Sequence, residues 1–273
     1  MNIDVAANKR FLDTSAQPAA DDWDTLLVNQ VDVTIATELE LLMRLNSWSR
    51  AEHVIDAGCG NGYYVSRLAD FFPDKGYLGI DISPALTAAA AARYPEIEFR
   101  AEDFFAGSPP TGDVLIMRYL VQHLGDFGAI LRQARRALTP GGALVVIESD
   151  LERSMMIPLP TTFLQMLGAY NAASAAGGGL KGQLLGDIAG LVAATGEPWR
   201  LEQEVEAATT LVGPFADHDI IRVFRMWVDL AERSAMFAFD FNAVRDELAA
   251  WGREPVSFVK LVTRMFVLQP TVQ

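Results

Sequence analysis

A glycine-rich segment at residues 54–62 constrains the fold more than any other feature of this 273-residue chain. It reads Val-Ile-Asp-Ala-Gly-Cys-Gly-Asn-Gly, an apolar run of strand length that passes into a turn, and residues 63–71 then have the pattern of a helix. Glycine lets the backbone of such a turn approach a ligand closely at the carboxyl edge of a sheet. The segment therefore predicts an α/β fold with a ligand at this turn.

Strand-like and helix-like segments alternate over residues 52–150. We expect strands at 53–57, 77–82, 97–101, 113–117 and 143–147, helices at 63–71, after Ser83-Pro84 and at 127–138, and a turn at 139–142. Alternation of this kind indicates right-handed βαβ units and a parallel sheet that is buried on both faces.

The rhythm changes after residue 150. We expect helices at 161–174 and 180–195, a strand at 200–211, two amphipathic helical stretches within 216–252 and a final strand at 258–268. Residues 1–50 have the pattern of a helical lead-in. The predicted organisation is a helical lid segment at 1–50 and one domain at 51–273, with helical inserts at about 151–179 and 212–256.

Composition excludes several classes of partner. The net charge of −13 argues against DNA, RNA and anionic membrane surfaces, which require a basic footprint, and favours a small or uncharged substrate. The single cysteine, Cys59, cannot form an intramolecular disulfide, and the three histidines are too far apart in sequence to predict a metal site. Because neither a signal peptide nor a membrane-spanning stretch is visible, we expect a cytoplasmic protein.

The glycine spacing narrows the ligand further. A dinucleotide-binding turn has the pattern G-x-G-x-x-G, but here the glycines fall at 58, 60 and 62, and Tyr63 stands at the third position of that pattern. Asp56 would repel a pyrophosphate and suits a cationic group instead. Asp81 ends the second predicted strand, where a carboxylate can accept hydrogen bonds from vicinal ribose hydroxyls. These residues predict a nucleoside ligand.

Five segments, in this order, resemble the motifs of class I S-adenosylmethionine-dependent methyltransferases of the small-molecule type. They are residues 54–62 (VIDAGCGNG), 77–83 (YLGIDIS), 100–104 (RAEDF), 112–124 (GDVLIMRYLVQHL) and 138–150 (LTPGGALVVIESD). The resemblance implies a Rossmann-like, seven-stranded, mostly parallel sheet with helices on both faces, an antiparallel last strand and helical lid or cap insertions. It also implies S-adenosyl-L-methionine as the methyl donor. Residues 1–50 and 151–273 match only in general plan.

The cofactor-binding residues that the resemblance implies are Asp56, Gly58, Gly60, Gly62, Asp81, Ile82, Asp103, Phe104 and Arg118. The three glycines would line the methionine and the ribose, Asp56 would hold the methionine ammonium, and Asp81 would bind the ribose hydroxyls. Ile82 would pack on adenine, Asp103 would accept from the adenine amine, and Phe104 would supply a backbone contact. The backbone of Arg118 would lie near the methionine moiety of the methyl donor.

Methyl transfer from a sulfonium is an in-line displacement, so the protein mainly positions the reactants and excludes water. A base is needed only where the acceptor must lose a proton. His123 is the first candidate base. Many small-molecule relatives have two adjacent histidines where this chain has Gln122-His123, and because of this difference a capping or packing role is the alternative. Tyr119 and Glu148 are the other catalytic candidates, and the side chain of Arg118 is a candidate partner for an acceptor carboxylate.

Aromatic residues outside these motifs either shape an acceptor pocket or form the core of a cap. They are Trp23, Tyr170, Phe215, Phe224, Trp227, Phe237, Phe239 and Phe241. The leading hypothesis is a methyltransferase acting on O, N or C of a small-molecule metabolite in specialised metabolism. Two alternatives stay open: a non-methylating reaction, such as cyclisation of S-adenosylmethionine with release of methylthioadenosine, and a catalytically idle binding module. Residues 1–50 either close over the site or pair with a second copy in a homodimer.

Overall fold

The structure, a computed structural model, describes residues 17–271, so residues 1–16 of the expected lid lie outside the described residues. The helices are α1 (Gln17–Met43), α2 (Asn46–Arg50), α3 (Tyr63–Phe71), α4 (Pro84–Arg93), the short 3-10 turn η2 (Val121–His123), α5 (Phe127–Ala137), α6 (Thr161–Ala176), α7 (Lys181–Gly186), α8 (Ile188–Thr195), α9 (Asp219–Ser234) and α10 (Phe241–Arg253). The strands are β1 (His53–Ala57), β2 (Gly76–Asp81), β3 (Glu98–Ala101), β4 (Gly112–Arg118), β5 (Leu138–Ile157), β6 (Trp199–Val212) and β7 (Phe258–Pro270).

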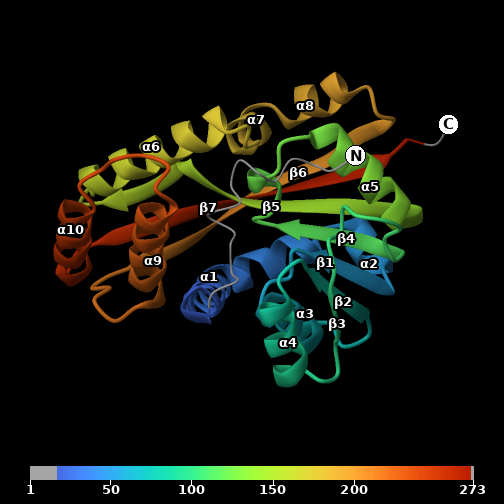
Figure 1. Ribbon diagram of the computed structural model, residues 1–273, viewed down its shortest axis with the longest axis horizontal. Coiled ribbons are helices and arrows are strands. Elements are labelled where there is room, and N and C mark those ends of the chain that lie inside the picture. The colour runs from blue at the N-terminus through green and yellow to red at the C-terminus, as the bar shows by residue number, and fades with distance from the viewer. Residues whose placement is uncertain (1–16, 272–273) are drawn as a thin grey trace.

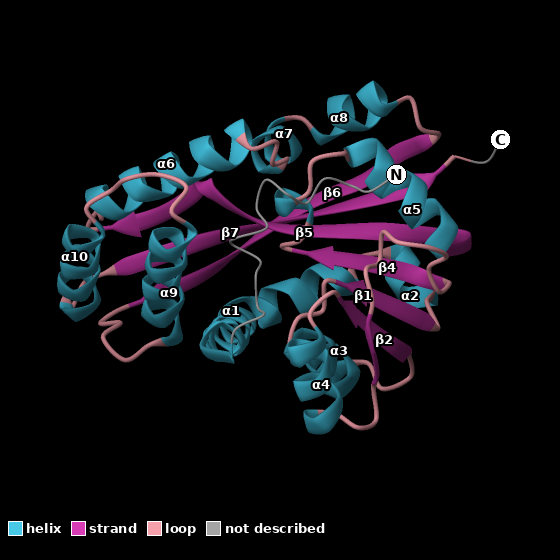
Figure 2. Ribbon diagram, in the orientation of Figure 1, coloured by secondary structure: helices cyan, strands magenta, loops and turns pink. Residues whose placement is uncertain are grey.

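The seven strands form one sheet in the order β3-β2-β1-β4-β5-β7-β6. Strands β1 to β5 pair in parallel, and β7 runs antiparallel to both of its neighbours, β5 and β6. Figure 2 shows helices on both sides of this sheet. The predicted Rossmann-like fold with an antiparallel last strand is therefore confirmed.

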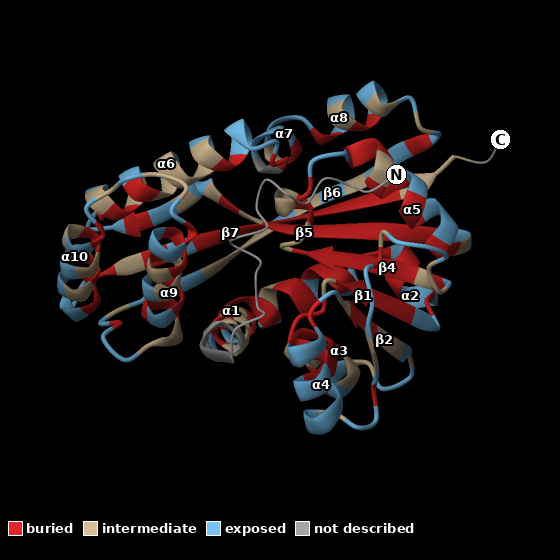
Figure 3. Cartoon of the chain, in the orientation of Figure 1, coloured by how far each residue is buried: buried red, intermediate tan, exposed pale blue. Residues whose placement is uncertain are grey.

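Side chains of the central strands alternate between two separate cores. On β5, Leu144 and Val146 belong to one core, which α5 and α8 cover, whereas Val145 and Ile147 belong to the other, which α2, α3 and the second half of α1 cover. Because successive residues of a strand face opposite sides, a strand buried on both faces has the continuous apolar run that the sequence displays. Figure 3 shows β4 largely buried, and on β5 residues 142–148 are buried as well.

A third core lies at the far ends of β5 and β7. It joins α6, α9, α10 and the first half of α1, with Phe163, Phe224 and Val228 fully buried at its centre. Figure 1 shows α6, α9 and α10 gathered at the left of the sheet, away from α3 and α4. The helices expected within the two inserts therefore pack on one another.

Three expected boundaries were wrong. Residues 139–142 do not form a free turn, because Leu138 already pairs with Gly112 and the strand continues through a register shift into Ala143. Strand β5 then extends ten residues beyond the expected end at 147, to Ile157, because β7 continues to pair with it. The single helix expected at 180–195 is two helices, since the side chain of Asp187 accepts from the backbone of Gly190 (2.8 Å) and starts a new one.

Candidate active site

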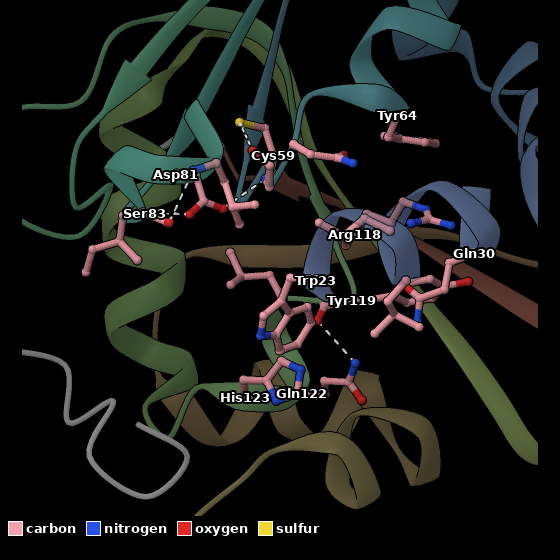
Figure 4. A pocket seen from close by; sticks show the side chains of 18 of the residues that line it. Trp23, Gln30, Cys59, Tyr64, Asp81, Ser83, Arg118, Tyr119, Gln122 and His123 are labelled. Carbon is pink, nitrogen blue, oxygen red and sulfur yellow. Dashed lines mark hydrogen bonds between the residues drawn. The ribbon is translucent and has the colours of Figure 1, made fainter. Parts of the chain in front are cut away.

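A cavity of about 260 Å³ opens at the carboxyl edge of the sheet. The glycine turn, the ends of β2 and β4, helix α1, the η2 turn and helices α6 and α9 all contribute to its lining. Figure 4 shows Asp81, Ser83 and Cys59 on one side of it and Gln122 and His123 on another. We call the part beside the glycine turn the donor side, and the part beside α6 and α9 the acceptor side.

The glycine turn requires glycine for two different reasons. Gly58, Gly60 and Gly62 have φ values of +82°, +54° and +74°, which L side chains rarely adopt. Gly58 and Gly60 line the cavity, and a Cβ at Gly60 would lie 2.5 Å from the Leu27 side chain. Gly62 is not among the described residues that line the cavity, and a Cβ there would lie 2.6 Å from the ring of Phe99. The third glycine therefore permits close packing behind the turn, and its place beside the cofactor stays a prediction.

Asp81 stands at the carboxyl end of β2 and organises the turn. Its Oδ2 accepts from the backbone N–H of Gly60 (2.9 Å), and its Oδ1 accepts from the backbone N–H of Ser83 (2.8 Å). Burial raises the pKa of this carboxyl, and the backbone donors act in the opposite direction by favouring the charged form. Each carboxylate oxygen keeps acceptor capacity toward the cavity, as a ribose diol would require.

Asp56, on β1 beneath the turn, is 2% exposed and lines the cavity. Its Oδ1 has no hydrogen-bond partner among the described residues. Burial raises the pKa of Asp56 to about 7; nearby Arg118 opposes this rise, while Asp81 and Glu38 add to it. A buried carboxylate that lacks a partner is costly, so the position suits a ligand that brings a positive charge.

The expected adenine-contacting residues lie together at the edge of the donor side. Ile82 is 66% exposed and lines the cavity, so its apolar side chain is available to a flat ring. Asp103 is also at the cavity edge, where its Oδ1 accepts from the backbone N–H of Phe105 (2.9 Å). Phe104 is buried at 7% exposed beside it.

Arg118, at the end of β4, lines the cavity, but its side chain is already engaged inside the protein. Its Nε donates to Oε2 of Glu38 on α1 (2.9 Å), and its Nη2 donates to Oε1 of Glu38 (3.1 Å) and to Thr34 Oγ1 (3.0 Å). The guanidinium also stacks on the rings of Tyr64 and Tyr119, at 4.8 and 4.2 Å from their centroids. This arrangement weakens the expectation that Arg118 binds an acceptor carboxylate. Sequence reasoning missed Glu38, although an acid at the helical spacing of the apolar residues Val31, Ile35 and Leu42 was a usable signal.

The segment after β4 brings Tyr119 and His123 to the cavity. Tyr119 has a φ of +54°, an unusual conformation for a residue with a side chain, and burial raises the pKa of its phenol. His123 ends the η2 turn and is half-buried at the cavity wall. The geometry thus brings two of the three catalytic candidates together.

Glu148, the third catalytic candidate, is not among the described residues that line the cavity. It is fully buried, and its Oε1 accepts from the backbone N–H of Gln122 (3.2 Å) in the η2 turn. Its neighbours along β5, Ser149 and Leu151, do line the cavity. Glu148 therefore supports the turn that carries His123, and a direct role at the acceptor stays a prediction.

Helix α1 covers the donor side and is tied to the glycine turn by residues that sequence reasoning missed. Asn61 donates from its side chain to Oδ1 of Asp24 (2.8 Å), and Arg93 of α4 donates to both carboxylate oxygens of Asp24 (3.0 and 3.2 Å). Farther along α1, Asp32 accepts from the hydroxyl of Tyr63 (2.6 Å). Trp23, Leu26 and Gln30 of the same helix line the cavity.

The eight aromatic residues divide between the cavity and the core. Trp23, Tyr170 and Trp227 line the cavity. Phe215 and Phe224 are fully buried in the third core, where Phe215 stacks on Trp251 at 5.1 Å, and Phe237, Phe239 and Phe241 contact one another. The aromatic residues are therefore divided between the wall of the cavity and the core of the cap.

The other two histidines, His53 and His218, are not among the described residues that line the cavity. His53 has a side chain 71% exposed, 3.8 Å from Asp113, and His218 caps α9 by accepting from the backbone N–H of Ile220 (3.1 Å). Within residues 17–271 we find no group of three or more His, Cys, Asp or Glu side chains arranged to hold a metal ion. The same residues contain no helix long and apolar enough to cross a membrane.

The donor side fits S-adenosylmethionine on three independent observations. Asp56 presents a buried carboxylate oxygen without a partner, which suits the ammonium of the methionine moiety. Gly58 and Gly60 present backbone to the cavity, because they line it and carry no side chain of their own. Asp81 stands where it can accept from a ribose diol, with its position fixed by two backbone donors.

Comparison with known proteins gives a family match over the centre of the chain. Residues 55–144 match the family model described as "Methyltransferase domain". Trans-aconitate 2-methyltransferase of Paracidovorax citrulli (strain AAC00-1) is 35% identical over 133 residues, which cover 47% of this chain and 51% of that protein. Aclacinomycin 10-hydroxylase of Streptomyces purpurascens is 33% identical over 149 residues, covering 51% of this chain and 39% of that protein. The chain thus spans about half the length of the first relative and less of the second.

A solved structure also resembles the chain over most of its length. It is a SAM-dependent methyltransferase of Geobacter sulfurreducens in complex with S-adenosyl-L-homocysteine, 18% identical, with a TM-score of 0.49, covering 86% of this chain and 89% of that one. The glycine turn and the strand order lie in and around the segment that matches this family model. Over residues 55–144 the chain is therefore similar to the methyltransferase-domain family, in agreement with the resemblance to class I S-adenosylmethionine-dependent methyltransferases.

Proposed function

We propose that this chain is a methyltransferase that uses S-adenosyl-L-methionine to methylate an oxygen, nitrogen or carbon atom of a small-molecule metabolite in specialised metabolism. The observation that carries the proposal is the continuity of the cavity. Asp56 and Asp81 on the donor side and Tyr170 and Trp227 on the acceptor side line one space. A donor held at the glycine turn would therefore face the part of the cavity that would hold the acceptor.

The residues have distinct proposed roles. S-Adenosylmethionine supplies a methyl group already activated on a sulfonium sulfur. The acceptor atom forms its bond to the methyl carbon as the carbon–sulfur bond breaks, and S-adenosylhomocysteine is left. Asp56 and Asp81 hold the donor, the apolar chamber excludes water, and His123 takes a proton from acceptors that must lose one. Tyr119 orients the acceptor beside it.

The helices around the cavity have proposed roles as well. Helix α1 acts as a lid, which covers the donor side through Trp23 and Leu26. Helices α6 and α9 shape the acceptor side through Met166, Tyr170 and Trp227. The Asp24–Arg93 ion pair supports this role, because it fixes α1 against α4 across the glycine turn.

A second candidate function is a reaction of S-adenosylmethionine other than methyl transfer. A relative named as a hydroxylase matches over 51% of this chain, which favours keeping a non-methylating reaction under test. Cyclisation of the donor with release of methylthioadenosine is one such reaction, and it needs no separate acceptor.

Mass spectrometry of S-adenosylmethionine incubated with the protein alone separates these candidates. We expect the donor to remain intact, and then to yield S-adenosylhomocysteine when an acceptor from a screen is added. Trans-aconitate belongs in that screen, because it is the substrate in the name of a relative. Methylthioadenosine formed without acceptor would replace the proposal with the second candidate. Binding with no turnover across the screen would indicate an idle module, and no binding by calorimetry would refute both.

A further inference from the structure

We propose that the acceptor is an uncharged, flat and largely apolar molecule, and that the acceptor side discriminates against anions. This proposal rests on the proposed function and narrows its substrate class. It is carried by where the charged side chains of the cavity lie.

Charge in the cavity lining is concentrated on the donor side. The acids that line the cavity are Asp56, Asp81, Glu102 and Asp103, all from the ends of β1 and β2 or the segment after β3. Among the described lining residues the permanent cation is Arg118, and its guanidinium is bound by Glu38 and shielded by two tyrosine rings. His123 also lines the cavity, and the role proposed for it as a base requires its neutral form. A second anion in the cavity would therefore meet acids, a neutral imidazole and one arginine that is already paired.

The acceptor side itself consists of apolar, aromatic and uncharged polar groups. The apolar surface comes from Leu151, Met166 and Leu167, and the flat surfaces come from the rings of Tyr170 and Trp227. Hydrogen-bonding groups are present as well, from Gln30, Ser149 and Asn171. Amides and hydroxyls orient a carbonyl or a hydroxyl of a ligand, but they do not compensate a buried carboxylate.

A smaller cavity of about 30 Å³ has an uncharged lining like that of the acceptor side. It shares Gln30, Tyr119 and Trp227 with the main cavity and reaches between α1, α9 and β7 to Thr34 and Thr263. No charged side chain is among the described residues that line it. It extends the acceptor side and gives room for a small uncharged substituent.

A matched pair of fluorescent probes tests the charge preference directly. N-Phenyl-1-naphthylamine and 8-anilinonaphthalene-1-sulfonate share one flat apolar skeleton and differ in the sulfonate. With the full chain saturated with S-adenosylhomocysteine, we expect the neutral probe to bind about tenfold or more tightly than the sulfonate, because no free cation compensates the anion. Equal binding, or tighter binding of the sulfonate, would overturn the proposal.

Three variants fix the site of binding. Gln30→Lys places a cation on the acceptor side and should tighten the sulfonate by about tenfold while changing the neutral probe little. Gln30→Met is the uncharged control and should leave the preference as in the wild type. Leu167→Trp fills the acceptor side and should abolish binding of the neutral probe while binding of S-adenosylhomocysteine persists. Neutral-probe binding that survives Leu167→Trp would place the probe elsewhere and refute the assignment.

The two proposals fail in different ways. Absence of S-adenosylhomocysteine binding to the wild-type chain, measured by calorimetry without any probe, would refute the proposed function and this inference with it. Normal binding of S-adenosylhomocysteine together with a preference for the sulfonate would refute this inference alone.

Discussion

Glu38 of α1 and Arg118 of β4 form a bidentate, buried ion pair, with the carboxylate 0% and the guanidinium side chain 5% exposed. The pair joins the helix that covers the cavity to the end of a central strand. Removing one partner leaves the other as an uncompensated charge inside the protein, which is far more costly than losing an exposed pair.

We therefore expect Glu38→Gln to lower the free energy of unfolding by about 3–5 kcal/mol. The exposed pair between Glu40 and Arg44 on the same helix supplies the control, and Glu40→Gln should cost less than about 1 kcal/mol. The double variant Glu38→Met/Arg118→Met should lose less than the sum of its single variants, because neither charge is then left alone. Urea denaturation of the wild type and of each variant measures these free energies of unfolding, and a Glu38→Gln cost equal to that of Glu40→Gln would contradict the prediction.

Asp56 predicts a specific pH dependence of stability. Its pKa in the folded chain is about 7, against an ordinary value of 3.8. Between these pH values the folded chain holds a proton that the unfolded chain has released, so the contribution of Asp56 to stability falls as pH rises through this window. Asp56→Asn does not titrate. We expect the stability of the wild type relative to Asp56→Asn to decline from about pH 4 to pH 7 and to level off above it.

The same carboxyl should link pH to ligand binding, with the opposite sign. A cationic ligand favours the ionised form of Asp56, so binding releases a proton wherever the free protein is protonated. The affinity for S-adenosylmethionine should rise as pH increases from about 6 to 7.5. Calorimetry in buffers of different ionisation enthalpy would detect the released proton. A flat affinity profile in the wild type would show that Asp56 does not meet the ammonium.

Gly60 and Gly107 separate crowding from backbone strain. Both have a positive φ, +54° and +85°, but a Cβ at Gly60 would lie 2.5 Å from Leu27, while nothing lies within 4 Å of one at Gly107. Gly107→Ala should cost about 1–2 kcal/mol of stability from strain alone. Gly60→Ala should cost more and weaken S-adenosylhomocysteine binding, and Leu27→Ala should restore part of the stability. Thermal unfolding and calorimetry measure both effects, and equal losses from the two alanines would exclude crowding.

His123 is expected to act as a base for acceptors that must lose a proton. His123→Ala should then lower kcat by about a hundredfold or more and remove the corresponding limb of the pH–rate profile, with donor affinity unchanged. His53→Ala is the control, because that side chain is 71% exposed and is not among the described residues that line the cavity. A loss of stability without a fall in kcat would assign His123 to packing instead.

The sequence was sufficient for the elements whose signals are local. Ser83 caps α4 as expected, with its hydroxyl accepting from the backbone of Leu86, because the cap and the following proline are encoded next to each other. The glycine turn was equally readable, since its φ values are ones that favour glycine. The mostly parallel sheet followed from βαβ alternation, and its antiparallel last strand followed from the family resemblance.

Features that depend on distant partners could not be predicted. Strand β5 extends to Ile157 because β7, more than 100 residues later, pairs with it. Which side chains of β5 line the cavity was not readable from the sequence either, and Ser149, which does line it, was overlooked. The close packing of Gly62 against Phe99 was equally hidden, because Phe99 lies on β3, beyond α3, β2 and α4.

The length of β5 limits how the acceptor specificity of this fold can be exchanged. Residues Leu144–Ile147 contribute to both cores of the sheet, while Met156, farther along the same strand, belongs to the core of the cap. The cap is therefore not an independent module, since the distal part of β5 belongs to its core. A chimera joined at residue 151 would interrupt a strand that the sheet and the cap share. Grafting a new acceptor specificity onto this scaffold would require exchanging the distal half of β5 and the facing part of β7 together with the helices.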